Sequence, residues 1–157
     1  MILSTNTRYA IRLIYELHQV RVPLSIPVLA ERINVSNKVI ENVHAELKKH
    51  GITDAIIGAN GGIRLVRSIE DISLGKMIEL FDSGVRFVVC FGNKSNNCPR
   101  QSVCETQSVW KTISNRIQHE LDSISLADIL DEYRQGASRE KPIRIHCINH
   151  KGELTFS

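Results

Sequence analysis

Apolar side chains recur every three or four residues through the first third of the chain, the spacing that places them on one face of a helix. Three such runs predict helices over residues 7–19, 25–33 and 36–50. A serine opens or precedes each run as a helix cap, and Gly51 suits the position just after the third helix. Because only residues 34–35 separate the second helix from the third, this pair predicts a helix-turn-helix.

The next two runs predict a β-hairpin. Residues 52–57 and 63–67 read as strands, and the glycine-rich sequence GANGG between them favours a tight turn. A helix-turn-helix followed by such a hairpin is a winged helix, so the expected fold class is mainly α with a small β-wing. A small α+β core without a DNA partner is the less favoured alternative.

The pattern after the hairpin predicts further helices. Ser73 can cap a fourth helix that ends at Gly84. A longer helix, residues 105–123, starts an apolar seam with the steps of a coiled coil, formed by Trp110, Ile113, Ile117, Leu121 and Ile124. A winged helix is too small to cover this seam alone, so the seam predicts a two-fold homodimer, although part of it can pack on its own domain.

These patterns divide the chain into four parts. We expect a winged helix-turn-helix domain (1–83), a cysteine sensor loop (84–104), dimerisation helices (105–135) and a C-terminal extension with a candidate β-hairpin (136–157).

Charge supports the DNA-binding interpretation of the first part. Residues 1–67 carry nine Lys/Arg and five Asp/Glu, a net of +4, whereas residues 68–157 carry eleven and twelve, a net of −1. A basic surface attracts nucleic-acid phosphates, although an ordinary solvated face has a similar composition.

Other function classes find little support in the sequence. No apolar run is long enough to span a bilayer and no signal-peptide cleavage site follows the N-terminus, so we expect a cytoplasmic protein with no membrane partner. We also find no Ser/His/Asp or Cys/His constellation, phosphate loop or paired carboxylates, so we expect no enzyme.

The start of the third predicted helix is the candidate reading surface. It presents asparagine, lysine and glutamate away from the core, and these side chains pair with adenine, with guanine or phosphate, and with cytosine. The helix N-terminus suits a phosphate, and glycines in the wing permit close backbone approach to DNA. The predicted DNA-binding residues are Arg8, Ser36, Asn37, Lys38, Glu41, Asn42, Gly58, Asn60, Gly61 and Arg64.

Three of the four cysteines lie close together in a polar loop, at Cys90, Cys98 and Cys104. Thiolates are the preferred ligands of iron–sulfur clusters and of zinc, and the C-x2-C pairs of zinc knuckles are absent here. Three thiolates leave one metal position for a weaker ligand, which suits a sensor. A disulfide between two of the three, acting as a redox switch, remains an alternative.

The order of these motifs resembles the Rrf-two family of bacterial transcription regulators. The resemblance covers about residues 1–132 and includes the three-cysteine loop. The matching segments are STNTRYA, LAERINVS, LKKHGI, GANGGI, SLGKMIE, VWKTI and SLADIL.

The resemblance implies a homodimer whose winged helices read a two-fold symmetric operator on double-stranded DNA. It also implies that Cys90, Cys98 and Cys104 hold a [2Fe–2S] or [4Fe–4S] cluster whose loss or oxidation changes DNA affinity. Gln107 stands where some cluster-binding members carry a histidine, so it is the candidate fourth ligand. The family also contains cluster-free regulators that use a thiol switch or a protein partner, as in cysteine-metabolism repression, and this is the second hypothesis.

Overall fold

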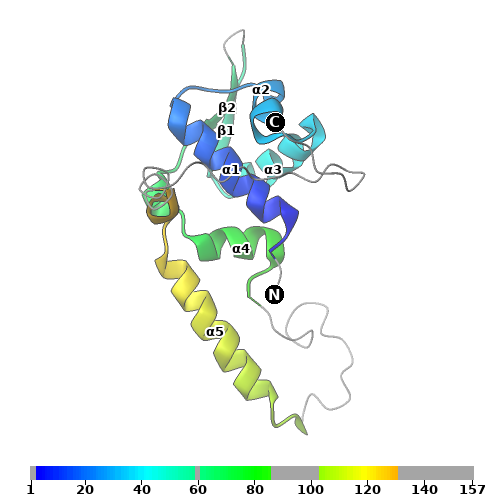
Figure 1. The fold of residues 1–157 in the computed structure, drawn as a ribbon, viewed down its shortest axis with the longest axis vertical. Coiled ribbons are helices and arrows are strands. Elements are labelled where there is room, and N and C mark those ends of the chain that lie inside the picture. The colour runs from blue at the N-terminus through cyan, green and yellow to red at the C-terminus, as the bar shows by residue number, and fades with distance from the viewer. Residues whose placement is uncertain (1–2, 59–60, 86–102, 131–157) are drawn as a thin grey trace, which may run out of the picture.

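The structure, a computed structural model, describes residues 3–58, 61–85 and 103–130 (Figure 1). Three helices are followed by a hairpin, a 3₁₀ turn and two more helices, and residues 126–130 are helical again. The elements are α1 (Thr5–Val20), α2 (Ile26–Ile33), α3 (Asn37–Lys49), β1 (Thr53–Ile56), β2 (Gly62–Leu65), the 3₁₀ turn (Ile69–Asp71), α4 (Leu74–Asp82) and α5 (Gln107–Ser123).

One apolar core holds the N-terminal helices, the hairpin and α4 together. The stripe predicted on α1 is buried at Ala10, Leu13, Ile14 and Leu17, and it contacts α2, α3, α4 and β2. The inner faces of α2 and α3, together with Ile63 of β2, join the same cluster. Burial of these side chains fixes the orientation of α3, which leaves its other face to solvent.

The start of α1 is tied to the end of α4. Ser4 caps α1 by accepting a hydrogen bond from the Thr7 backbone N–H at 3.2 Å. The Asp82 carboxylate accepts bonds from the Ser4 N–H at 3.1 Å and from the buried Thr7 hydroxyl at 2.6 Å. An acceptor with negative charge is favourable at a helix N-terminus, so Asp82 stabilises this junction.

The hairpin is the predicted wing. Its strands pair antiparallel, with Asp54 opposite Arg64 and Ile56 opposite Gly62. Leu24 adds a bridge on the other edge of β2, where Leu24 and Ile63 exchange two backbone hydrogen bonds of 2.9 and 2.8 Å. A Cβ on Gly62 would lie 2.5 Å from the Leu24 carbonyl group, so glycine permits this close approach.

The C-terminal half of α5 packs on α4. A Cβ on Gly75 would meet the Asp122 backbone N at 2.8 Å, so glycine lets the two helices approach. The Gln118 side chain accepts a bond from the Val85 N–H at 3.1 Å. Beyond α5, Leu126 and Leu130 are part of the main core. Helical residues 126–130 therefore pack against the N-terminal domain.

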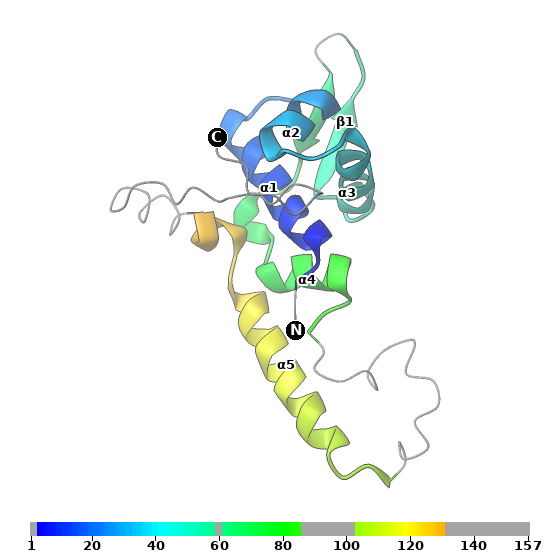
Figure 2. The ribbon, with the colours of Figure 1, turned by 45° about the vertical axis from the view of Figure 1, so that its right-hand side comes forward.

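The N-terminal half of α5 projects away from the other described helices and the hairpin (Figures 1 and 2). We call this half, together with the residues that lead into it, the arm (residues 103–113). Val109, Trp110 and Ile113 on this arm are 53 %, 39 % and 36 % exposed. The later seam residues, Ile117 and Leu121, are half-buried. The predicted seam is therefore partly covered by its own domain and open at the arm.

The predicted fold class is confirmed, with several shifted boundaries. Helix α1 begins two residues before its predicted start, and α5 begins two residues after its predicted start. Helix α3 ends one residue before its predicted end, with His50 as its cap. The strands are shorter than predicted, and the bridge at Leu24 was not foreseen. Residues 86–102 of the predicted cysteine loop and the predicted C-terminal hairpin lie outside the described residues. Within the part of the chain that is described, no helix is long and apolar enough to cross a membrane.

Candidate nucleic-acid interface

The outer face of α3 is the first part of the candidate interface. Asn37, Lys38, Glu41 and Asn42 are all exposed, as predicted, while Ile40 on the opposite face is fully buried. Lys38 Nζ lies 3.2 Å from Glu41 Oε2 across one turn of the helix. An exposed ion pair of this kind contributes little to stability. Both side chains can therefore leave each other and bind groups on a ligand instead.

The N-terminus of α3 is also exposed. Ser36 occupies the capping position, but its side chain makes no capping hydrogen bond. The first backbone N–H groups of a helix have no partner inside the helix, and the helix dipole makes this end positive. The Ser36 hydroxyl and the first turn of α3 therefore suit a phosphate oxygen.

The base of the wing carries a three-residue ion cluster that joins α3 to both strands, formed by Lys48, Asp54 and Arg64. Lys48 Nζ lies 3.0 Å from one Asp54 carboxylate oxygen, and Arg64 lies 4.0 Å from the other. The hydrogen bond from Lys48 lowers the pKa of the Asp54 carboxyl, and the Ala55 backbone N–H and the Arg64 charge act in the same direction. Asp54 is therefore ionised at neutral pH.

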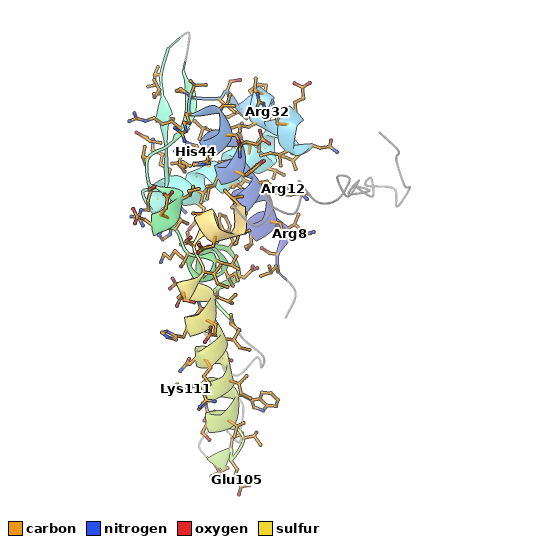
Figure 3. All side chains as sticks on the ribbon, turned by 60° about the vertical axis from the view of Figure 1, so that its left-hand side comes forward. Arg8, Arg12, Arg32, His44, Glu105 and Lys111 are labelled. Carbon is orange, nitrogen blue, oxygen red and sulfur yellow. The ribbon has the colours of Figure 1, made fainter. Side chains whose placement is uncertain are left out.

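A second link from α3 to the wing lies just beside this cluster. His44 Nδ1 and Thr53 Oγ1 form a hydrogen bond of 3.0 Å, and Thr53 is almost fully buried. Burial lowers the pKa of His44 and the Lys48 charge adds to this effect, while the Asp54 charge opposes it. Figure 3 shows His44 beside the wing strands. A neutral His44 thus helps to fix the wing against α3.

The wing also borders a pocket of about 410 Å³. Its lining includes His18, Arg21 and Arg64, together with apolar side chains from α1, the connector and both strands. Arg64 therefore lies between the ion cluster and further basic groups.

The remaining predicted DNA-binding residues are spread around this surface. Arg8 is exposed on α1 and donates a hydrogen bond of 3.3 Å to Thr5 Oγ1. In Figure 3 it lies along α1 with Arg12, to the side away from His44. Gly58 and Gly61 form the wing turn, with a 2.9 Å bond from the Gly61 N–H to the Gly58 carbonyl. Asn60 lies outside the described residues.

Of the predicted metal ligands, only Cys104 and Gln107 are in the described part of the chain, and Cys90 and Cys98 are not. Cys104 is half-buried, and its Sγ lies 3.5 Å from Thr106 Oγ1. Gln107 is the first residue of α5. In the described ranges no three His, Cys, Asp or Glu side chains gather as a metal site.

Three interface residues were missed from the sequence. Lys48 had a usable signal, since it follows Glu41 by two helical turns and so shares its face of α3. Asp54 and His44 had none, because their roles depend on the strand register and on the packing of α3 against β1, which short-range patterns do not contain.

Comparison with known proteins gives these features a context. A family model described as Rrf2, iron-dependent transcriptional regulator, matches residues 3–132. The chain belongs to the Rrf2 family. It is 30 % identical to protein rrf2 of Nitratidesulfovibrio vulgaris over 132 residues, which cover 83 % of this chain and 87 % of the relative. It is 29 % identical to the HTH-type transcriptional regulator IscR of Aliivibrio salmonicida, over 89 % of this chain and 84 % of the relative.

Solved Rrf2-type structures have the same fold. IscR of T. potens matches with a TM-score of 0.65 and 28 % identity, covering 87 % of this chain and 90 % of that structure. CymR, the global cysteine regulator of B. subtilis, matches with a TM-score of 0.63 over 84 % of this chain and 98 % of its own length. At 24 % identity, the CymR likeness supports the fold alone. The chain is thus a DNA-binding transcription regulator of the Rrf2 family and not an enzyme.

Proposed function

We propose that this Rrf2 regulator binds a two-fold symmetric operator as a homodimer in the cytoplasm, and that a cluster in its cysteine loop controls the binding. The observation that carries the DNA-binding part is the exposed polar face of α3 beside a wing that presents Arg64. The two surfaces lie next to each other because His44 and the ion cluster join α3 to β1 and β2.

On this proposal α3 enters the major groove. Asn37, Lys38, Glu41 and Asn42 read base edges, and Lys38 and Glu41 separate from each other to do so. Ser36 and the N-terminus of α3 hold a phosphate. The backbone contacts come from the remaining predicted residues, Arg8 and, in the wing, Gly58, Asn60, Gly61 and Arg64.

The arm of α5 forms the dimer in this proposal. Val109, Trp110 and Ile113 give it an exposed apolar surface, and the same helix from a second copy is the partner that closes it. Because the other half of α5 is packed on α4, the dimer contact sets the distance between the two copies of α3.

The donor set fits an iron–sulfur cluster. Cys90, Cys98 and Cys104 supply three thiolates, and Gln107 is the candidate fourth ligand. Cys104 and Gln107 stand at the N-terminus of α5, where the helix dipole favours thiolates and an anionic group. When bound, the cluster supplies a reversible change in charge and ligation. Cys104 is the ligand that would pass such a change to α5, and α5 would pass it to the dimer contact.

A cluster-free thiol switch is the second candidate. The side chain of Cys104 is partly exposed. This favours a thiol switch, because a redox-active thiol requires solvent access. In this version the same loop forms a disulfide, or a protein partner binds the regulator, and DNA affinity changes without iron.

An anaerobic purification separates the two candidates. We expect a coloured protein with iron and sulfide in stoichiometric amounts, and we expect its affinity for DNA to change when the cluster is removed. A Cys98→Ser variant should lose both the colour and the response. Colourless wild-type protein without iron or sulfide would exclude the cluster. A full redox response in Cys98→Ser would contradict both the cluster and a thiol switch that uses Cys98.

A further inference from the structure

The two strands of the wing contain one carboxylate, and it lies between two cations. Asp54 is the acidic residue of the two strands, and its carboxylate contacts Lys48 of α3 and Arg64 of β2 at 3.0 and 4.0 Å. Its side chain is 43 % exposed, and those of Lys48 and Arg64 are 54 % and 50 % exposed. All three side chains can therefore be reached by a phosphate backbone that contacts α3 and the wing together.

The ion cluster is weakly held compared with a buried pair. Exposed ion pairs gain little energy because water screens them, so neither cation needs Asp54 for the protein to fold. His44 and the backbone pairing of the strands already fix α3 against the wing. A structural role for Asp54 is thus largely duplicated, and its main effect is electrostatic.

The effect of Asp54 on DNA binding depends on how closely the DNA is docked. Two cations and one carboxylate give this part of the surface a net charge of only +1. In a loosely docked complex with arbitrary DNA, Asp54 stays nearer to both cations than any phosphate does. In an operator complex, base contacts by α3 fix the register, so that phosphates can replace Asp54.

We propose that Asp54 is a specificity-determining residue, which competes with phosphates for Lys48 and Arg64 and so weakens binding to arbitrary DNA more than binding to an operator. The inference rests on the proposed DNA-binding surface. Since non-specific affinity is almost entirely electrostatic, two cations released from Asp54 should act most strongly there.

The test is Asp54→Asn, measured by fluorescence anisotropy on a duplex of random sequence over a series of salt concentrations. We expect the affinity for this duplex to rise by about 3- to 10-fold at low salt, and the log–log salt slope to steepen by about 0.9 for each cation that gains a phosphate. On an operator obtained by in vitro selection the gain should be smaller, so the ratio of operator to random affinity falls.

Glu79→Gln is the matched control. Glu79 is an exposed partner of Lys76 at 2.8 Å on α4, so the control makes the same charge change and also breaks one surface pair. It should leave the random-DNA affinity within about 2-fold of wild type, because α1 lies between α4 and the wing (Figure 1). Equal gains in Asp54→Asn and Glu79→Gln would mean that net charge alone acts, which overturns the inference.

A double-mutant cycle locates the effect. In an Arg64→Gln background the gain from Asp54→Asn should shrink, since one of the two released cations is absent. An undiminished gain, or a loss of affinity in Asp54→Asn, would contradict competition for these cations. Asp54→Ser repeats the test with a smaller side chain, and thermal melts check that each variant is folded.

The inference and the proposed function fail in different ways. If the wild-type protein shows no salt-dependent affinity for any duplex, the DNA-binding surface itself is wrong. If wild type binds DNA normally and Asp54→Asn behaves like Glu79→Gln, only the role of Asp54 is wrong.

Discussion

The α3–wing surface and the α5 arm are built in opposite ways. On α3 the apolar side chains Ile40 and Leu47 are fully buried, and the outer face is charged or polar. On the arm, Trp110 and Ile113 remain more than one-third exposed. The first region is complete within one chain and offers polar groups to a polar partner. The second leaves apolar area that one chain does not cover, so we expect its partner to be protein.

The largest stability difference should come from truncating one buried and one exposed apolar side chain of the α3–wing region. Leu47→Ala creates a cavity in the core under α3 and should lower the free energy of unfolding by about 2–5 kcal/mol. Ile57→Ala, at a wing residue that is 99 % exposed, should change it by less than about 0.5 kcal/mol. Urea denaturation of both variants measures the contrast, and equal losses would contradict the assigned burial.

A charge on the arm should affect assembly rather than folding. Ile113→Asp places a carboxylate in the proposed dimer contact, and we expect monomers by light scattering and an operator affinity lower by about 10²-fold, because bivalent binding is lost. Asn115→Asp adds the same charge at another exposed residue of α5 and serves as the control. A dimer that survives Ile113→Asp would place the interface elsewhere.

Changes on the outer face of α3 should affect sequence discrimination more than stability. Glu41→Ala removes one predicted base reader and should reduce discrimination at one base pair by about 1–3 kcal/mol. Arg64→Ala should instead weaken all sequences alike and reduce the salt slope by about 0.9. Binding to single-base variants of the operator separates these patterns, and no change in either variant would show that another surface reads DNA.

The smallest effect should be the pH dependence from His44. Because its pKa lies below the ordinary value of 6.5, the folded state binds fewer protons than the unfolded state just below that pH. The stabilisation is complete above 6.5 and is lost as the pH falls toward the lowered pKa. Between about pH 7.5 and about pH 5.5, the Tm of wild type should therefore fall by more than the Tm of His44→Gln. Parallel Tm curves for the two proteins would contradict this.

The two regions also differ in how well the sequence predicts them. The helices of the N-terminal domain follow from apolar spacing and capping serines, since those signals act over one or two turns. Contacts across the chain were not predictable in this way. Asp82 meets Ser4 and Thr7 from 75 or more residues away, and the bridge from Leu24 to Ile63 depends on the completed fold.

Within the candidate site, too, only the features that depend on local spacing were predictable from the sequence. The exposed residues of α3 were identified from helical periodicity, because the buried stripe fixes which face remains outside. The ion cluster was not, because it depends on which residue of β1 stands opposite Arg64. For the seam of α5, the spacing predicts an apolar stripe but not how much of that stripe the same domain covers. In the structure, the same domain partly covers the C-terminal part of the stripe.

In vitro selection of duplex DNA by the anaerobically purified protein tests the central claim most directly. A dimer that reads DNA through two copies of α3 should enrich an inverted repeat, with half-site centres about 34 Å apart, one turn of the double helix. Asp54→Asn should enrich the same repeat less strongly. Failure to enrich any sequence, or enrichment of single sites without two-fold symmetry, would contradict a dimeric operator-binding regulator.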